Sequence, residues 1–345
     1  MFRIAKPFYF RTISSLHCGS GNDLGMVDLP IQREKHTSFP KVESSSLKGA
    51  IREAFENKLE QQKVEFLEII SKNDSSKIGF ENINDKKRLK LSFDYSIQLL
   101  FGYDEDNLDE LIKKEFEEDS EFSGALAFSD ARILFFPVRS AKGIFAWITC
   151  PYVLNRYVED LKLCYKDFRL NIPSVDIGQC ITYANNKISI NNTSVVLEEY
   201  RFNEQQNLNI DPILSKFREM NELKERVVVL NDDDFRDFVN QFTEIITRTK
   251  IDNLTGTVAQ GALFNEEYLP PETIMYFLVF STPIFQKEEK KKGIFNQNGK
   301  KEEELVMEFF VKNLPEVMQL GGNATIGKGI IKINEINQNN DKGGK

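Results

Sequence analysis

The residues from Leu16 to Arg52 are LHCGSGNDLGMVDLPIQREKHTSFPKVESSSLKGAIR, and the rest of the chain is organised around them. An apolar, strand-like run precedes this segment, and an amphipathic helix beginning at its serines follows it. Unpaired backbone N–H groups point outward where a loop meets a helix N-terminus, so such a loop is a natural phosphate site. The alternative is a long surface loop whose glycines only form turns.

Length and composition are those of a globular protein: 345 residues, 41% of them hydrophobic. This size allows one large domain with insertions, or two domains. No run approaches the ~20 apolar residues of a membrane span, and Lys6, Pro7 and Arg11 interrupt what would otherwise resemble a signal peptide. The four cysteines form no CxxC pair and only two histidines exist, which disfavours a zinc site. We therefore expect a cytoplasmic protein with reduced cysteines and no membrane partner.

Charge is unevenly distributed along the chain. The net charge of −8 argues against nucleic-acid binding over the whole surface. Residues 1–52 nevertheless contain eight Lys or Arg against four Asp or Glu, a local balance of +4, whereas residues 101–122 are strongly acidic. An anionic ligand is therefore expected at the basic segment, and the candidates to bind it are Arg33, Lys35, Lys48, Arg52 and, in a later turn, Arg139.

Hydrophobic periodicity predicts an α+β protein with a ferredoxin-like sheet that carries insertions. Residues 60–122 are charged and predict a helical insertion. Residues 176–203 combine short alternating runs with Asn-Asn turns and few core-forming side chains, which indicates either a protruding hairpin arm or an ordinary surface hairpin. The expected strands are 8–16, 131–138, 143–149, 227–230, 273–281 and 330–336, and the other expected helices are 44–59, 231–249 and 302–320.

Asp28 is the most unusual carboxylate, because it lies between Val27 and Leu29 close to the basic cluster. It is either a turn aspartate before Pro30 or a metal ligand or proton acceptor beside a phosphodiester. His17 is a candidate to donate to a phosphate oxygen or to move a proton. Glu266 and Tyr268 are two residues apart in an extended piece and so share one face.

A second glycine loop, GGNATIGKG, connects the last predicted helix to the last strand. Glycines allow backbone to approach a ligand closely and a lysine adds charge, so the candidate contacts with an anionic ligand here are Gly321, Gly322, Gly327, Lys328 and Gly329. The chain has neither a GxGxxG fingerprint nor a P-loop, which disfavours nucleotide-cofactor folds.

Four motifs together resemble one protein family. They are LHCGSGNDLGMVDLPIQREKHTSFPKVESSSLKGAIRE, ARILFFPVRSAKGIFAWITCP, NEEYLP and GGNATIGKG, in this order and spacing. They are similar to those of the backbone subunit of the Cmr complex, the type III-B CRISPR effector, which is a Cas7-group member of the RAMP superfamily. The first motif is long and specific, and the glycine-rich motif is shared across the superfamily.

The resemblance implies a single RAMP palm domain over residues 1–345, ferredoxin-like and RRM-related, with a protruding β-hairpin thumb at about 176–222. Copies would stack head to tail along a CRISPR guide RNA, together with other Cmr subunits, and cleave complementary target RNA at regular intervals. The anionic ligand of the basic residues and of the second glycine loop would then be RNA. The family's cleavage aspartate falls on Asp28, which would also bind a divalent metal, Mg or Mn. His17, Glu266 and Tyr268 correspond to residues near the scissile phosphate.

Two other functions remain possible on the sequence. One is a non-catalytic backbone that binds RNA while another subunit cuts it, and Asp28 is the residue that discriminates the two. The other is a small-molecule enzyme that uses both glycine loops for a phosphate ligand, for which the chain offers no cofactor fingerprint.

Overall fold

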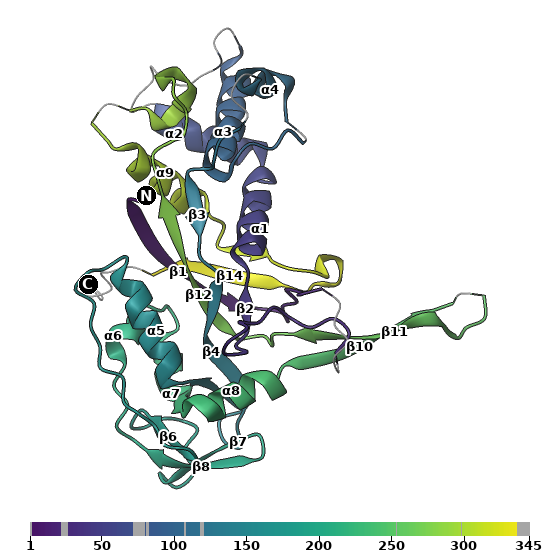
Figure 1. The fold of residues 1–345 in the computed structure, drawn as a ribbon, viewed down its shortest axis with the longest axis vertical. Helices are drawn as coiled ribbons and strands as arrows, with labels where there is room; N and C mark the ends of the chain where they lie inside the picture. The colour runs from purple at the N-terminus through teal and green to yellow at the C-terminus, as the bar shows by residue number, and fades with distance from the viewer. Residues whose placement is uncertain are drawn as a thin grey trace. The chain divides into compact units, whose positions relative to one another are not determined.

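The structure of the protein, a computed structural model, describes residues 2–21, 27–71, 80, 83–106, 108–117, 121–252, 254–297 and 299–336 (Figure 1). The chain divides into two compact units. Unit 1 consists of residues 1–6, 47–129 and 279–316, and unit 2 of residues 7–46, 130–278 and 317–345. Within the described residues, no helix is long and apolar enough to cross a membrane.

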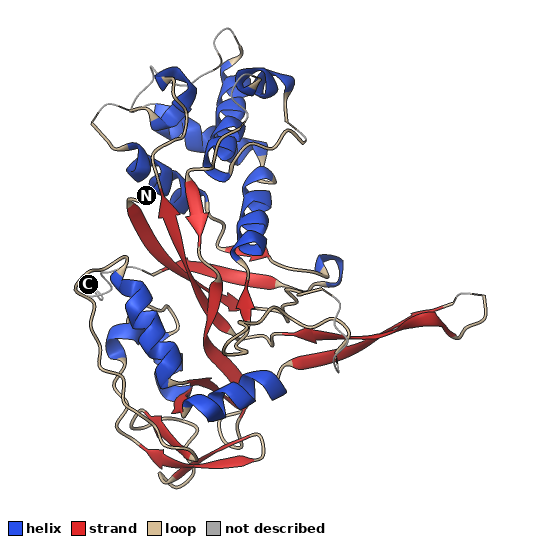
Figure 2. Cartoon of the chain, in the orientation of Figure 1, coloured by secondary structure: helices blue, strands red, loops and turns tan. Residues whose placement is uncertain are grey.

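Unit 1 is mainly helical, as the blue ribbons in Figure 2 show. Side chains cap two of its helices: Asn84 accepts a hydrogen bond from the backbone of Lys86, and Asp109 accepts one from Leu111. The helical character predicted for residues 60–122 is thus confirmed over α2 to α4. The elements are α1 (Ser44–Glu56), α2 (Glu60–Ser71), α3 (Asp85–Phe101), α4 (Glu110–Phe116), β3 (Leu126–Phe128), the 3-10 helix η1 (Glu289–Phe295) and α9 (Glu302–Asn313).

Unit 2 contains most of a large mixed sheet, in the order β13-β14-β1-β12-β4-β5-β9-β6-β8-β7. β5 pairs with β9, and β6 with β8, in parallel. Its strands are β1 (Ile4–Thr12), β2 (Lys41–Val42), β4 (Ala131–Arg139), β5 (Phe145–Thr149), β6 (Gln179–Thr182), β7 (Ser194–Leu197), β8 (Tyr200–Gln205), β9 (Val227–Leu230), β10 (Glu244–Ile251), β11 (Val258–Tyr268), β12 (Ile274–Ser281), β13 (Val317–Gln319) and β14 (Ile330–Glu335). Its helices are α5 (Pro151–Lys162), α6 (Asp211–Leu214), α7 (Met220–Arg226), α8 (Asp232–Gln241) and the 3-10 turn η2 (Ala324–Ile326).

The hairpin predicted at residues 131–149 is confirmed. β4 and β5 pair antiparallel, with Phe136 opposite Ile148. Their side chains are almost all buried, and the Trp147 indole donates to the Glu272 carbonyl at 2.8 Å. The final strand and the strand at 227–230 are also where the hydrophobic pattern placed them.

The protruding hairpin predicted at residues 176–203 is wrong. β6 pairs with β9, and β7 and β8 extend the same sheet. Ile188, Val195 and Leu197 are fully buried, so the segment fills a core that its polar turns concealed. The predicted thumb range of 176–222 therefore belongs to the body of unit 2.

The hairpin that does protrude is formed by β10 and β11, at the right of unit 2 in Figure 1. The sequence had indicated a helix from residue 231 to 249, but α8 ends at Gln241 and a strand follows. Similarly, the helix expected to reach residue 320 ends at Asn313, before Pro315, and β13 follows. The polar tail expected after residue 336 lies outside the described residues.

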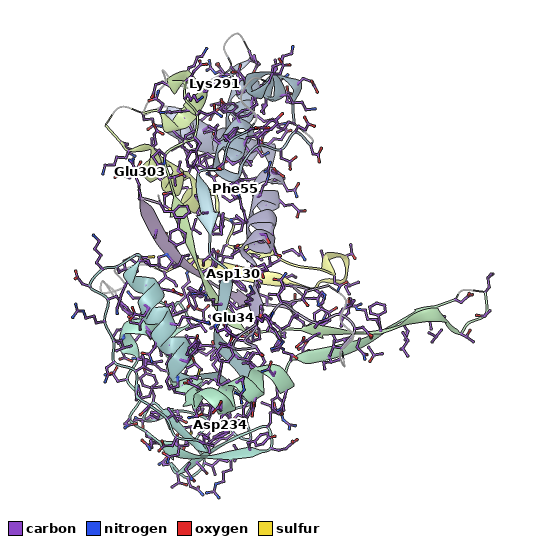
Figure 3. The ribbon with its side chains drawn as sticks, viewed as in Figure 1. Glu34, Phe55, Asp130, Asp234, Lys291 and Glu303 are labelled. Carbon is purple, nitrogen blue, oxygen red and sulfur yellow. The ribbon has the colours of Figure 1, made fainter. Side chains whose placement is uncertain are left out.

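Phe55, labelled in Figure 3, anchors the aromatic core of unit 1. It is fully buried, with its ring centroid 5.4 Å from that of Phe101 and 5.8 Å from that of Phe310. Phe55→Ala should therefore lower the free energy of unfolding by about 3–5 kcal/mol, measured by denaturant titration. Leu59→Ala is the control, because Leu59 is 68% exposed and should cost less than about 0.5 kcal/mol. Equal effects of the two substitutions would contradict this packing.

Candidate active site

The last residues of β11 collect the predicted site residues in unit 2. Leu29 forms a parallel bridge with Glu266, and Leu16 an antiparallel bridge with Leu269. Two strand-like pieces of the loop that begins at Leu16 are thereby fixed along one edge of β11, the edge opposite β10. The two sides of this contact are far apart in sequence, 237 residues between Asp28 and Asn265. Asp28, His17, Glu266 and Tyr268 all depend on this one piece of backbone.

Asp28 lies at the exposed edge of this arrangement. Its Oδ2 accepts a hydrogen bond from the Asn265 backbone N–H at 2.8 Å. Its other carboxylate oxygen has no partner among the described residues. The hydrogen bond holds the side chain in place, and the free oxygen remains available to a ligand.

His17 is buried next to this edge. Its Nδ1 lies 2.7 Å from the Glu267 carbonyl oxygen, and its ring centroid lies 5.4 Å from that of Tyr268. The Gly322 backbone N–H donates to the His17 carbonyl at 2.8 Å, so the second glycine loop packs directly on this residue.

Glu266 and Tyr268 form a tight polar cluster. The Tyr268 hydroxyl donates to Glu266 at 2.6 Å, and Asn323 Nδ2 lies 2.9 Å from the Tyr268 oxygen and within 3.3 Å of both Glu266 oxygens. Arg248 forms an ion pair with Glu266 and a hydrogen bond with Tyr268. Lys328 Nζ stands 5.0 Å from the Tyr268 ring centroid.

The pKa values within the cluster follow from these contacts. Burial by itself would raise the pKa of Glu266, but hydrogen bonds from Tyr268, Asn323 and Arg248, with the positive charge of Arg248, lower it overall. Burial, and next the hydrogen bond to Glu266, raise the pKa of Tyr268. Glu266 is therefore an anion at neutral pH and Tyr268 a neutral hydroxyl.

Glu267 has a different role from its two neighbours. Its carboxylate forms an ion pair with Arg33 and accepts hydrogen bonds from the Ile31 backbone at 3.1 Å and from Thr243 at 2.7 Å. Arg33 also donates to Ser38, Val239 and Asn240. Arg33, a predicted RNA contact, is thus already engaged in holding the loop, and any RNA contact would be additional.

The other predicted basic contacts differ in whether they already form an ion pair within the chain. Lys35 is exposed and Lys48 half-buried, and neither has an ion-pair partner among the described residues. Burial, and next the charge of Arg52, lower the pKa of Lys48. Arg52 pairs with Glu56, and Arg139 with Glu198. Their contacts with RNA stay predictions.

The glycines of the second loop have structural reasons of their own. A Cβ at Gly321, where φ is +78°, would lie 2.3 Å from the His17 carbonyl oxygen. A Cβ at Gly329, where φ is +74°, would lie 2.0 Å from the Leu320 carbonyl oxygen. Gly327 also has a positive φ but faces open space. Gly321 thus fits the loop against His17 and Gly329 fits it against Leu320. The role of these glycines in RNA binding stays a prediction.

Sequence reasoning missed three residues of the cluster: Arg248, Glu267 and Asn323. Arg248 was assigned to a helix, and only strand register places it diagonally across from Glu266. Asn323 is the one amide side chain in GGNATIGKG, and it adopts φ +65°, which asparagine tolerates better than most residues. A single asparagine among these glycines was the signal that the sequence offered for this residue.

A divalent metal fits these residues only where a bound phosphate supplies further ligands. No group of three or more His, Cys, Asp or Glu side chains suited to a metal occurs among the described residues. Mg²⁺, however, usually keeps several waters and takes one or two carboxylates together with substrate phosphates. The free oxygen of Asp28 meets that requirement as a single protein ligand.

Comparison with known proteins shows the family of this chain. The RAMP superfamily profile matches residues 9–332. The CRISPR system Cmr endoribonuclease Cmr4 of Pyrococcus furiosus is 34% identical over 331 residues, which cover 93% of this chain and 92% of that protein.

Two solved structures show the same fold. The crystal structure of oligomeric Cmr4 from Pyrococcus furiosus has a TM-score of 0.61 at 26% identity, and covers 97% of this chain and 99% of that one. A chain of the type III-B Cmr-beta complex bound to cognate target RNA has a TM-score of 0.63 at 21% identity, and covers 97% and 98%. The chain therefore belongs to the RAMP superfamily and, within it, to the family of Cmr4 proteins.

Proposed function

We propose that this chain is the guide-RNA-binding backbone subunit of a type III-B CRISPR effector, and that it cleaves complementary target RNA at regular intervals. The observation that carries the proposal is the convergence of Asp28, His17, Glu266 and Tyr268 on residues 265–268 of β11. The 34% identity to a Cmr endoribonuclease supports it. Guide RNA, target RNA, other Cmr subunits and further copies of this chain, stacked head to tail, are the proposed partners.

The chemistry needs few protein groups, because the RNA supplies its own nucleophile. The 2′-hydroxyl attacks the adjacent phosphorus once the nucleotide is held in line. A carboxylate beside a phosphate is repulsive unless it accepts a proton or shares a cation with it. A bound Mg²⁺ or Mn²⁺ would neutralise charge on the phosphate.

Positive charge for the phosphate comes from Lys328. Arg248 is already paired with Glu266, whereas Lys328 has only the Ser15 hydroxyl as a hydrogen-bond partner, at 3.2 Å, and no carboxylate among the described residues. Its ammonium group stands over the same ring that His17 packs against. An ammonium group in this position favours a phosphate near His17 and Asp28.

The β10–β11 hairpin is proposed as the thumb that displaces one target nucleotide at each step. It protrudes from unit 2 (Figure 1) and leads directly into the site through β11. It also exposes apolar side chains, which suit contact with unstacked bases: Ile245, Ile251, Leu254, Val258 and Leu263. The ferredoxin-like palm is proposed to be the part of the sheet around β14, β1, β12 and β4.

A non-catalytic backbone is the second candidate. The observation in its favour is that Asp28 is a lone exposed carboxylate, outside the buried Glu266 cluster. Asp28 therefore remains the residue on which the two functions are distinguished.

Asp28→Asn should separate cleavage from binding. Asparagine keeps the hydrogen bond from Asn265 but cannot take up a proton or hold a cation well, so the cleavage rate should fall at least ~10²-fold. Target affinity, measured by gel shift on the same assembled complex, should be retained. Asp167→Asn, at an exposed aspartate with no hydrogen-bond partner among the described residues, is the control. Unchanged cleavage by the Asp28→Asn complex would favour the non-catalytic backbone.

Lys48→Gln should weaken guide RNA binding about equally for all sequences. Its half-buried ammonium has a lowered pKa, and a phosphate would stabilise the charged form. The slope of log affinity against log salt should therefore decrease by about 1. Lys113→Gln, which removes a charge already paired with Glu110, should leave the slope unchanged. Identical slopes for wild type and Lys48→Gln would remove this residue from the RNA interface.

Shortening the β10–β11 hairpin should abolish regular cutting without unfolding the protein. Thr249 and Leu263 lie opposite each other, so residues 250–262 can be replaced by Asn-Gly in a two-residue turn. Denaturation should be unchanged, because none of the described side chains in this range is buried. A variant in which residues 250–262 are replaced by a Gly/Ser segment of the same length is the control, because it keeps the length of the segment. Regular cut spacing with the short hairpin would show that the hairpin is not the thumb.

A further inference from the structure

Gly19 stands directly in front of the His17 imidazole. A Cβ built at Gly19 would lie 2.8 Å from His17 Nε2, 3.5 Å from Cε1 and 3.6 Å from Cδ2. The near-equal distances to the two flanking carbons place it opposite Nε2, between the in-plane direction of the lone pair and one face of the ring. At 2.8 Å it would be closer to Nε2 than a non-bonded carbon can lie. A side chain at Gly19 would therefore crowd Nε2 and narrow the space through which a hydrogen-bonding partner reaches it.

Local backbone geometry does not require glycine here. Gly19 forms an extended bridge with Ile31, and its φ lies outside the left-handed region. This differs from Gly321 and Gly329, whose positive φ and backbone contacts exclude other residues. At Gly19 the three nearest atoms all belong to the His17 ring, so the imidazole is what a side chain would obstruct.

The hydrogen bond at the other nitrogen fixes the tautomer. The Glu267 carbonyl oxygen can only accept, so His17 Nδ1 must carry the proton in that 2.7 Å contact. In the neutral imidazole Nε2 is then an acceptor and needs a donor. The described residues provide none, and Nε2 is not among their fully buried unpaired polar atoms.

The sugar-phosphate backbone of RNA offers one such donor. Its phosphate oxygens only accept at neutral pH, whereas the 2′-hydroxyl donates and also distinguishes RNA from DNA. The partner that fits Nε2 is therefore the hydroxyl that acts as nucleophile in the proposed function.

We propose that Gly19 is a positioning residue that keeps His17 Nε2 open to the 2′-hydroxyl of the nucleotide at the cut, so that Nε2 takes its proton. This inference rests on the proposed endoribonuclease function. As the proton passes to Nε2, the 2′-oxygen bonds to phosphorus and the P–O5′ bond breaks. The departing 5′-oxygen takes a proton from water, and the products end in a 2′,3′-cyclic phosphate and a 5′-hydroxyl.

Gly19→Ala is the direct test, because it puts a methyl group against Nε2, at 2.8 Å before any shift. The access of Nε2 can be read without cleavage: diethyl pyrocarbonate modifies accessible neutral imidazoles, and peptide mass spectrometry quantifies them. The chain has only two histidines, so His36, whose side chain is 70% exposed, is an internal reference. Gly49→Ala, at a helical glycine with open space around its Cβ position, is the matched control.

In the assembled complex, Gly19→Ala should lower His17 modification relative to His36 at least ~5-fold, and single-turnover cleavage at least ~10-fold. Target affinity should not change. His17→Asn is the second variant, because its amide can still donate to the Glu267 carbonyl while Nε2 is lost. His17→Asn should bind target normally and cleave it as slowly as Gly19→Ala does. The test therefore stays valid if Gly19→Ala misfolds.

Each of the other possible results would refute one specific part of the proposal. Normal modification of His17 in Gly19→Ala would refute the geometry. The proton transfer would be refuted if Gly19→Ala shielded His17 but cleaved normally, or if His17→Asn cleaved normally. Neither result would contradict the endoribonuclease function. A wild-type complex that binds target but does not cut it would refute the proposed function itself, and the modification result would still report on Gly19.

Discussion

The buried carboxylate of Glu267 is the constraint on which the site depends. It accepts hydrogen bonds from Ile31 and Thr243 and pairs with Arg33, while the carbonyl of the same residue accepts from His17. A buried carboxylate is costly unless all its partners are present. Because those partners come from the loop after β1 and from the start of β10, the loop has only one favourable position on β11.

The same loop is held from its other side by Glu34, labelled in Figure 3. Arg156 of α5 donates to both Glu34 oxygens, at 2.7 and 2.8 Å, and Thr37 donates to one of them at 2.6 Å. Two adjacent loop residues thus form ion pairs with different elements. Arg33 pairs with Glu267 of β11, and Glu34 pairs with Arg156 of α5. This double attachment fixes the loop that carries Asp28, which itself stays exposed.

Several elements followed from local sequence. The serine run, with apolar residues at helical spacing, predicted α1, and Leu47, Ile51 and Phe55 are indeed its buried face. β10 was misassigned because Ile245 and Ile246 also suit the apolar side of a helix, although the β-branched residues around them favour a strand. That error moved the protruding hairpin to residues 176–203, where the density of polar turns hid the buried Ile188 and Val195.

The sequence by itself determined the α+β class, the helical character of residues 60–122 and the candidates Asp28, His17, Glu266 and Tyr268, because these depend on local periodicity and on motifs within short segments. Tertiary structure alone decided that the four candidates converge, that Arg33 and Glu267 hold the loop, and that Arg248 and Asn323 complete the cluster. The physical reason is that these contacts join residues far apart in the chain, such as His17 and Glu267 at a separation of 250 residues. No local pattern encodes such a pairing, which forms only when a buried charge finds all its partners in the folded chain.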